Sequence, residues 1–257
     1  MIQIPIIGNL FHGGNRKKYI LNQISKFVLK GVILAGGFGK RLKPITDNRP
    51  KPMIEILGKP IIEWQIKLLS KNNITEIIIC VGYLKEQIIN HIASGNKFKV
   101  KVAYMVEEEP LGTGGALKNT QALLKDEKNG FFMINGDILT NIDFNILSHK
   151  NDYNSIAVVP LRSPYGIVDF NDQQFVTGFK EKPNIIDKWI NAGIYFFNQE
   201  IFDFLPDKGN IETTALPALA NEQKLKAKKF EKSFWKSIDS HKDIEESAKE
   251  LSRINSK

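Results

Sequence analysis

The chain contains 257 residues, of which 42% are hydrophobic and 25% charged, and its formal net charge at pH 7 is +8. These fractions are typical of a soluble globular protein and exclude a largely disordered chain; no apolar run approaches the roughly 18 residues that cross a bilayer, so we expect no membrane association. The positive charge is spread over many lysines without a recognised nucleic-acid-binding motif, so we expect no nucleic-acid partner.

Residues 1–29 differ from the rest of the chain and are predicted to form an N-terminal appendage. An apolar start is followed by Gly13-Gly14 and then by apolar residues at helical spacing. This segment could pack on the domain that follows, mediate self-association into a homo-oligomer, or reflect a start codon placed too far upstream. The sequence leaves these three alternatives open.

Residues 30–257 are predicted to form one domain, and its first half has a regular pattern. Short apolar runs alternate with helical patterns, the arrangement expected of βαβ units around a parallel sheet. Strands are predicted at 31–35, 74–81, 100–106 and 131–134, and helices at 60–69, 84–93 and 114–124. Cys80, the single cysteine, lies in the second of these strands, which excludes a disulfide framework, indicates a core residue and favours a cytoplasmic location.

The second half is less regular and predicts a mixed sheet. Strands are expected at 155–161, 166–170, 174–179 and 194–197, with a hairpin turn around Asn171-Asp172. The lysine-rich stretch 224–232 is interrupted by apolar residues and is typical of a solvated strand or helix edge. Ile244, Ala248 and Leu251 mark a closing helix. The predicted fold is therefore α/β, with a doubly wound, mainly parallel mixed sheet flanked by helices.

The most informative segment directly follows the first strand. It reads Leu-Ala-Gly-Gly-Phe-Gly-Lys-Arg-Leu-Lys-Pro over residues 34–44. Ligands of open α/β sheets bind beyond the carboxyl ends of the strands, and three glycines in four positions let backbone N–H groups turn toward phosphate oxygens. Arg41 could bind those oxygens bidentately, and Lys51 is stiffened by a proline on each side. Neither a G-x-G-x-x-G motif nor a P-loop occurs, which argues against dinucleotide oxidoreductases and ordinary NTPases.

These residues resemble the opening signature of the sugar-1-phosphate nucleotidyltransferase family, which is close to L-A-G-G-x-G-x-R-L-x-P followed by K-P-M. The resemblance runs from about residue 31 to about residue 251. It implies a Rossmann-like fold and an enzyme that joins a nucleoside triphosphate to a sugar 1-phosphate and releases pyrophosphate. It also implies that Arg41 and Lys51 stabilise charge on the triphosphate during attack on its α-phosphorus. The nucleotide would lie against Leu34, Ala35, Gly36, Gly37 and Gly39.

Asp137 is the first candidate metal ligand. It ends the turn Asn135-Gly136-Asp137 after an apolar strand, and carboxylate oxygens are the ligands that Mg²⁺ prefers. The same tripeptide is also an ordinary turn, but the family resemblance implies a metal-binding aspartate here. A second family ligand is expected in a pattern resembling W-x-D-x-G-T, where this chain has Ser237. Asp239 lies two residues later, on the same side of an extended strand, and a related F-W-x-x-x-D-[ST] form makes it the predicted second ligand.

The sugar phosphate is assigned to the second half by resemblance. Glu181-Lys182-Pro183 resembles the family's E-K-P element, in which the glutamate binds sugar hydroxyls and the lysine holds the phosphate. Read alone, this tripeptide is a solvated charge pair before a turn. Asn191 and Gly193 resemble the family's sugar-pocket strand, and Gly166 matches a sugar-contacting glycine.

The base is assigned to the segment after the third strand. The family places the base near the stretch 109–115, and we expect Gly82, Glu109, Gly112 and Thr113 to bind the nucleotide. A carboxylate at Glu109 could accept the N1–H and N2–H₂ donors of guanine, a pairing that uracil and thymine cannot offer. This pairing favours GTP. The segment resembles that of guanylyltransferases that act on mannose- or heptose-1-phosphate.

Two alternatives stay open. Residues 234–240 also resemble glucose-1-phosphate cytidylyltransferases, so a cytidylyl- or thymidylyltransferase acting on glucose-1-phosphate is the second candidate. Lys40 occupies a position that is often a small hydroxyl residue, and Ser237 replaces an expected aspartate. Both departures would permit a non-catalytic paralogue that binds sugar nucleotides and regulates a partner.

Overall fold

The computed structural model describes residues 29–148 and 153–255, so the predicted appendage lies outside the described residues apart from Leu29. The strands are β1 Lys30–Ala35, β2 Glu55–Ile56, β3 Lys59–Pro60, β4 Glu76–Val81, β5 Lys101–Val106, β6 Phe131–Asn135, β7 Ile138–Thr140, β8 Asn154–Arg162, β9 Ile167–Phe170, β10 Val176–Lys180, β11 Asn184–Phe197, β12 Leu225–Lys229 and β13 Trp235–Ser237. The helices are α2 Ile61–Lys71, α3 Lys85–Ile92, α4 Gly112–Asn119, α5 Gln121–Leu124, α6 Ala215–Asn221 and α7 His241–Asn255.

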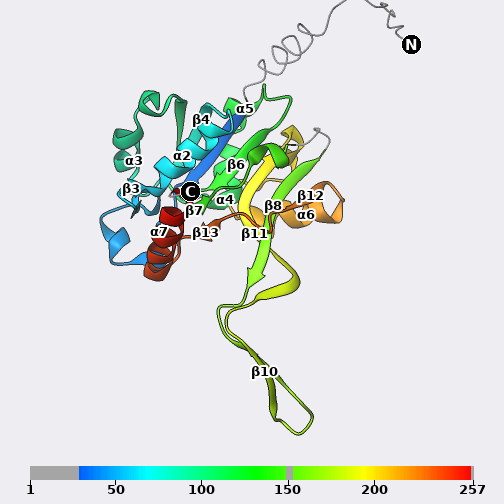
Figure 1. Ribbon diagram of the computed structural model, residues 1–257. Coiled ribbons are helices and arrows are strands. Elements are labelled where there is room, and N and C mark those ends of the chain that lie inside the picture. The colour runs from blue at the N-terminus through cyan, green and yellow to red at the C-terminus, as the bar shows by residue number, and fades with distance from the viewer. Residues whose placement is uncertain (1–28, 149–152, 256–257) are drawn as a thin grey trace, which may run out of the picture.

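One seven-stranded sheet forms the centre of the molecule, with the order β12-β8-β11-β6-β1-β4-β5 (Figure 1). β1 is parallel to both β4 and β6, β4 is parallel to β5, and β12 is parallel to β8. β11 runs antiparallel to its neighbours β6 and β8. The prediction of a mainly parallel mixed sheet is confirmed. Because β1 lies between β6 and β4, the loop after β1 emerges between the ends of those two strands.

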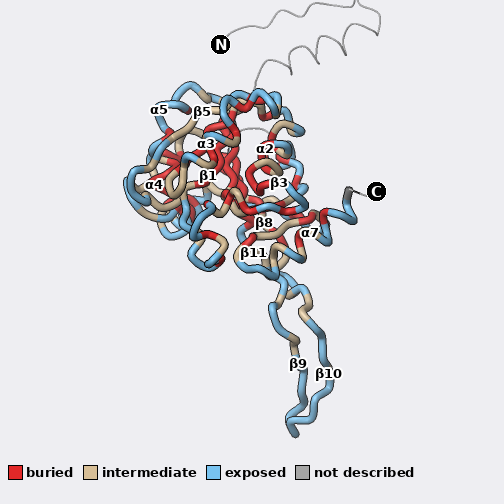
Figure 2. The backbone as a smooth tube through the Cα atoms, turned by 90° about the vertical axis from the view of Figure 1, so that its left-hand side faces the viewer, coloured by how far each residue is buried: buried red, intermediate tan, exposed pale blue. Residues whose placement is uncertain are grey.

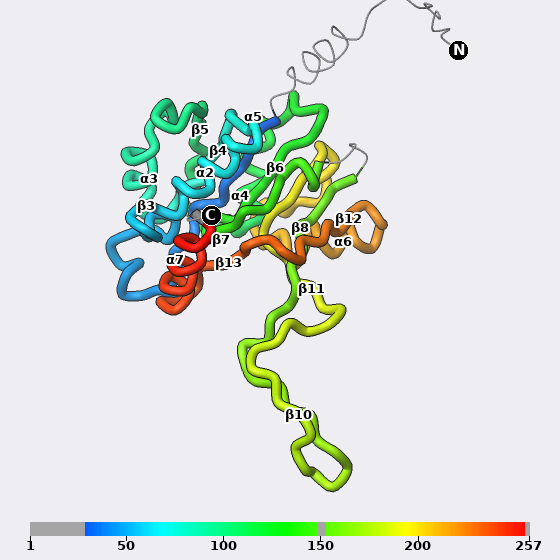
Figure 3. Tube along the Cα trace, viewed as in Figure 1, coloured from blue at the N-terminus to red at the C-terminus, as the bar shows by residue number. Residues whose placement is uncertain are grey.

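Helices cover both faces of the sheet (Figure 3). On one face, Ile66 of α2 packs in a cluster with Ile33 of β1. On the other face, Leu117 of α4 packs with Val32 of β1, and α5 and α6 join the same cluster. Val32 and Ile33 are neighbours that point to opposite faces, which is why the strand reads as a continuous apolar run. Cys80 is fully buried in the second cluster, which confirms its prediction as a core residue.

A third, smaller apolar cluster supports the loops at the carboxyl end of the sheet. It joins the short helix Lys40–Leu42, the β2–β3 hairpin, the β7–β13 pair and α7. Leu42 and Ile238 are fully buried in it, and Leu251 of α7 is nearly so. The cluster therefore brings the C-terminal part of the chain beside the loop that follows β1.

β9 and β10 form an antiparallel hairpin that projects away from the rest of the molecule (Figures 1 and 2). We call residues 165–180 the arm. Its turn confirms the hairpin predicted around Asn171: the side-chain Oδ1 of Asn171 accepts hydrogen bonds from the backbone N–H groups of Gln173 (3.1 Å) and Phe175 (3.0 Å). These side-chain bonds add to the backbone bond of the turn, in which the N–H of Gln174 donates to the carbonyl oxygen of Asn171 at 2.8 Å.

Several predicted boundaries were wrong. The predicted helix 114–124 is two helices, α4 and α5, that meet at Thr120, whose hydroxyl donates to the carbonyl oxygen of Leu117 at 2.6 Å. A side chain that bonds to the backbone in this way competes with regular helical geometry. β11 begins at Asn184 rather than residue 194, and α6, which contains Pro217, was not predicted. The lysine-rich stretch contains β12, an edge strand, as expected.

Within the ranges 29–148 and 153–255, no helix is long and apolar enough to cross a membrane.

Candidate active site

The loop after β1 is shaped by its glycines. Gly39 has a φ of 61°, and a Cβ built on it would lie 2.9 Å from the side chain of Thr46. Thr46 in turn donates a hydrogen bond from its hydroxyl to the carbonyl oxygen of Gly39 at 3.0 Å. A residue with a side chain would be strained in this left-handed conformation and would collide with Thr46. Leu42 anchors the end of the turn in the third apolar cluster.

Two cations and two carboxylates from distant parts of the sequence meet beside this loop. The ammonium nitrogen of Lys51 contacts Asp137 Oδ2 at 2.7 Å and Asp239 Oδ1 at 2.8 Å. Arg41 contacts the same Oδ1 of Asp239 through its Nη2 at 2.8 Å. Lys51 is the most enclosed of the four, with its side chain 13% exposed, whereas Arg41 is 76% exposed and faces solvent. The structure thus brings together all four of the predicted catalytic and metal-binding residues.

Asp239 is held by a network of its own. Ser237 donates its hydroxyl to Asp239 Oδ2 at 2.8 Å, and the backbone N–H of Asp239 donates to Asp243 at 3.1 Å. Burial alone would raise the pKa of the Asp239 carboxyl, but the hydrogen bonds from Lys51 and Ser237 and the charge of Arg41 lower that pKa below its usual value. Ser237, which stands where the sequence pattern expected an aspartate, therefore contacts the carboxylate that reaches the cluster.

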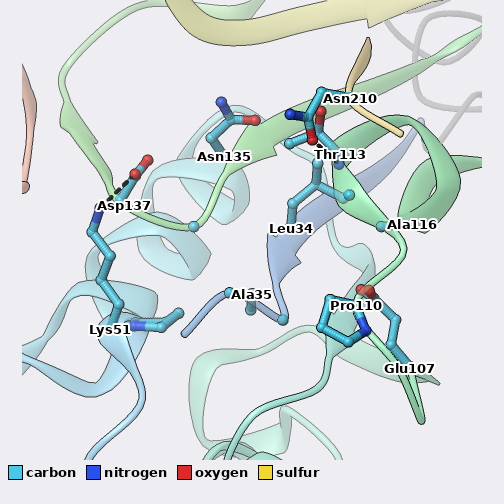
Figure 4. Close-up of a pocket in the computed structure, with 15 residues that line it drawn as sticks. Leu34, Ala35, Lys51, Glu107, Pro110, Thr113, Ala116, Asn135, Asp137 and Asn210 are labelled. Carbon is cyan, nitrogen blue, oxygen red and sulfur yellow. Dashed lines mark hydrogen bonds and ion pairs between the residues drawn. The ribbon is translucent and has the colours of Figure 1, made fainter. Parts of the chain in front are cut away.

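A cavity of about 310 Å³ opens next to this cluster (Figure 4). It is lined by Leu34 and Ala35 at the end of β1 with Gly36 and Gly37 after them, and by Asn135 at the end of β6 with Asp137 after it. Its size lies within the range of small-molecule sites. The remaining wall comes from Lys51, Pro52, Glu107, Pro110, Gly112, Thr113, Ala116, Gly136 and Asn210.

The start of α4 allows close packing around the cavity. Gly112 has a φ of 75°, and a Cβ on it would lie 2.6 Å from the carbonyl oxygen of Gly209. Gly82, at the end of β4, approaches the loop after β1, because a Cβ there would lie 3.0 Å from the carbonyl oxygen of Gly36. Thr113 is fixed by its hydroxyl, which donates to Glu212 at 2.7 Å. Backbone atoms rather than long side chains therefore form much of this wall.

Comparison with known proteins agrees with this geometry. A model of the nucleotidyl transferase family matches residues 30–253. The chain belongs to this family. The "Mannose-1-phosphate guanyltransferase 2" of Candida glabrata is 34% identical over 227 residues, which cover 84% of this chain and 63% of that protein. The present nucleotidyl transferase thus matches somewhat under two thirds of the length of this relative.

Solved structures give the same relationship over nearly their whole length. HddC from Yersinia pseudotuberculosis is 31% identical, with a TM-score of 0.67, over 87% of this chain and 99% of HddC; its structure is also known in a complex with GMP-PN. A putative glucose-1-phosphate thymidylyltransferase from Bacillus anthracis, 21% identical, matches 88% of this chain and 95% of its own with a TM-score of 0.70 and shares the fold. The Rossmann-like fold predicted for this nucleotidyl transferase is confirmed.

Besides Asp137, a second carboxylate lines the cavity of this nucleotidyl transferase: Glu107, which the sequence reasoning missed. Glu107 Oε2 accepts a hydrogen bond from the backbone N–H of Leu111 at 3.2 Å, and a Cβ on Gly36 would lie 2.8 Å from Oε1. Burial raises the pKa of the Glu107 carboxyl, and the bond from Leu111 opposes that rise. Glu109, the residue chosen from the sequence, is 80% exposed, pairs with Lys208 at 3.6 Å and lines only a neighbouring hollow.

The predicted sugar-phosphate residues fall into two groups. Gly193 has a φ of 67° and packs against Asn135, and its backbone N–H donates to the side chain of Asn191 at 2.8 Å. These two residues lie on β11, next to the strand end that carries Asp137. The other three, Gly166, Glu181 and Lys182, lie at the root of the arm and do not line the cavity. A Cβ on Gly166 would lie 3.1 Å from Glu181, and Glu181 pairs with Lys182 at 3.3 Å.

The donor set of the cluster fits a hard divalent cation. Asp137 and Asp239 both direct a carboxylate oxygen at the single ammonium nitrogen of Lys51, so the two groups face a common point. Two carboxylates suit Mg²⁺, which completes its octahedron with water and substrate phosphates. Among the described residues no group of three or more histidine, cysteine or carboxylate side chains could hold a metal. A site here would therefore depend on substrate for part of its coordination.

Proposed function

We propose that this chain transfers a guanylyl group from GTP to a sugar 1-phosphate of the mannose or heptose type, with release of pyrophosphate. The observation that carries the proposal is the meeting of Arg41, Lys51, Asp137 and Asp239 beside a cavity of about 310 Å³. The relative from Candida glabrata, a mannose-1-phosphate guanyltransferase by name, and the complex of HddC with GMP-PN support a guanine nucleotide.

The reaction needs charge neutralisation and alignment rather than a protein nucleophile. A phosphate oxygen of the sugar 1-phosphate attacks the α-phosphorus, the bond from that phosphorus to the oxygen bridging the β-phosphate breaks, and pyrophosphate leaves with the electron pair. Lys51 would hold the phosphates from the enclosed side and Arg41 from the solvent side, as their exposures of 13% and 76% indicate. Mg²⁺ bound by Asp137 and Asp239 would supply further positive charge at the phosphates.

Glu107 is the residue that we assign to base recognition. An ionised carboxylate can accept both the N1–H and the N2–H₂ of guanine, whereas cytosine, uracil and thymine do not offer that pair of donors. Glu107 Oε2 is already oriented by the N–H of Leu111, and Oε1 lies against Gly36 at the edge of the cavity. Glu109 keeps its pairing with Lys208 and is not needed for this contact.

Of the five predicted sugar-phosphate-binding residues, two lie near the proposed metal ligands. Asn191 and Gly193 lie beside the proposed metal ligands, which supports a role in binding the sugar. The roles of Gly166, Glu181 and Lys182 stay predictions, as does the cytoplasmic location. Glu181 and Lys182 lie at the root of the arm, so they would reach the sugar phosphate only if the root closes toward the cavity.

A pyrophosphate-release assay tests the function. The full chain is assayed with GTP, CTP, UTP, dTTP and ATP against mannose-, heptose- and glucose-1-phosphate, with Mg²⁺ and with Mg²⁺ removed by EDTA. We expect turnover that requires metal and is fastest with GTP and a mannose-type sugar phosphate. Preference for CTP or dTTP with glucose-1-phosphate would replace the guanylyl assignment. Absence of turnover with every pair would refute the enzyme and favour a regulatory sugar-nucleotide-binding protein.

Glu107→Gln serves as the specificity control in the same assay. The amide keeps the size of the side chain but cannot accept two donors through equivalent oxygens, so discrimination for GTP over CTP should fall. Glu109→Gln is the matched variant, because it removes the same charge two residues away, outside the cavity. Equal effects of the two substitutions would remove Glu107 from base recognition.

A further inference from the structure

Lys40 differs from the two cations of the cluster in what it contacts. Arg41 and Lys51 both contact a carboxylate. Within the ranges 29–148 and 153–255 Lys40 has no carboxylate partner; its exposed ammonium nitrogen lies 5.9 Å from the centre of the Phe38 ring. A cation–π contact at that distance is weak compared with a charge-assisted hydrogen bond to a phosphate oxygen. The ammonium group of Lys40 is therefore available to an anionic ligand.

Lys40 lines a second space, of about 240 Å³, which we call the smaller hollow. Lys51 and Asp137 line both this hollow and the cavity of about 310 Å³. Of these two spaces, Glu107 lines only the larger cavity, whereas Lys40 and Arg41 line only the smaller hollow. The contact between Lys51 and Asp137 thus stands where the two spaces meet.

A nucleotide bound with its base at Glu107 would extend through both spaces. Figure 4 shows Glu107 on one side of the larger cavity and Lys51 with Asp137 on the other. The triphosphate would run from the nucleoside toward Lys51 and Asp137, and the phosphates farthest from the base would enter the smaller hollow beyond them. The two phosphates that leave as pyrophosphate would then lie beside Lys40.

We propose that Lys40 is a further phosphate-binding residue, whose ammonium group donates hydrogen bonds to the terminal phosphates of the triphosphate and then to pyrophosphate. The two cations of the cluster face two carboxylates, so these four side chains together carry no net charge. Lys40 adds a positive charge in the smaller hollow that no carboxylate of the described residues offsets. The assignment rests on the proposed function, which sets the direction in which the nucleotide lies.

The position of Lys40 makes it selective among the ligands of the site. GTP and pyrophosphate would place phosphates in the smaller hollow, whereas the sugar nucleotide product keeps both of its phosphates between nucleoside and sugar, in the larger cavity. Lys40 therefore strengthens the binding of the first two ligands and not of the third. Lys40 stands where the family signature often has a small hydroxyl residue, so a single substitution supplies this charge.

Titration calorimetry of the full chain with inorganic pyrophosphate and Mg²⁺ tests the assignment without turnover. Lys40→Thr should raise the dissociation constant for pyrophosphate about tenfold, because it removes a charge-assisted hydrogen bond to phosphate. Lys40→Arg keeps the charge and should change that constant by no more than about threefold. The sugar nucleotide that forms in the pyrophosphate-release assay should bind both variants within about twofold of the unaltered chain, since salt screens more distant exposed charges.

Lys43→Thr is the matched control. It removes the same charge three residues away, but Lys43 does not line the smaller hollow and already pairs with Asp47 at 3.0 Å. Pyrophosphate should bind this variant as tightly as the unaltered chain. Both lysines are exposed, so thermal unfolding should show every variant folded.

The assignment is overturned if Lys40→Thr binds pyrophosphate as the unaltered chain does, or if Lys43→Thr weakens that binding equally. An equal loss in the binding of the sugar nucleotide, or no pyrophosphate binding by the unaltered chain, would overturn it as well. Failure of the proposed function would appear differently, as absence of turnover with every substrate pair in the pyrophosphate-release assay.

Discussion

Replacing Asp239 by asparagine is the sharpest test of the proposed active site. The substitution keeps the shape of the side chain but removes the charge that contacts Lys51 and Arg41 at 2.8 Å each. A charged group that acts on reacting phosphates or their metal contributes about 3–4 kcal/mol, and each 1.4 kcal/mol is tenfold in rate, so kcat should fall about 100- to 1000-fold. Lys51 keeps its contact with Asp137 at 2.7 Å, so the free energy of unfolding should fall by no more than about 1–2 kcal/mol.

The assay is pyrophosphate release at saturating substrates, repeated over a range of Mg²⁺ concentrations. Ser237→Ala removes one hydrogen bond to Asp239, worth about 1 kcal/mol, so it should lower kcat only about fivefold. Asp243→Asn is the matched control, because Asp243 accepts hydrogen bonds from Asp239 N and Ser240 but does not contact the cations of the cluster. Asp243→Asn should lower the free energy of unfolding while leaving kcat nearly unchanged. If kcat fell less than about tenfold in Asp239→Asn, or fell equally in Ser237→Ala, the proposed role of Asp239 would be refuted.

Three further predictions follow from the cavity. Glu107→Gln should lower kcat/KM for GTP about 10- to 100-fold while changing that for CTP little, measured by pyrophosphate release. Burial raises the pKa of Glu107 above the usual glutamate value of 4.5, and only the ionised carboxylate accepts both guanine donors. The KM for GTP should therefore begin to rise on acidification at a pH above 4.5. This part of the pH dependence should disappear in Glu107→Gln. Gly112→Ala should lower the free energy of unfolding by about 1–3 kcal/mol in urea, because of its positive φ and its approach to Gly209, whereas Gly37→Ala, with open space around it, should change that energy little.

Much of the fold could be predicted because the buried strands read as long apolar runs. β1, β4 and β6 lie close to their predicted ranges, and the turn at Asn171 was recognised from its residue types. Short elements were missed because they are stabilised by tertiary contacts rather than by a local pattern. The β7–β13 pair, for example, has three residues in each strand and is held by the third apolar cluster.

The cluster of cations and carboxylates could be predicted in its members but not in its contacts. Family motifs placed Arg41, Lys51 and Asp137 near the ends of β1 and β6, where an open sheet binds ligands. The choice between Ser237 and Asp239 depended on the path of the chain after β13. In the structure the strand ends at Ser237, and two residues later the carboxylate of Asp239 contacts Lys51.

The sequence could not show which of the three consecutive glutamates at 107–109 faces the cavity. Guanine recognition by a carboxylate was a sound chemical argument, but any of the three could have supplied it. The backbone N–H of Glu107 donates to Val81 at 2.8 Å, so the pairing of β5 with β4 extends through this residue and fixes its side chain beside Gly36. Glu108 and Glu109 lie beyond that bond, and they pair with surface lysines instead. Which of the three carboxylates faces the cavity is therefore decided by where the strand pairing ends, a property of two strands that are distant in sequence.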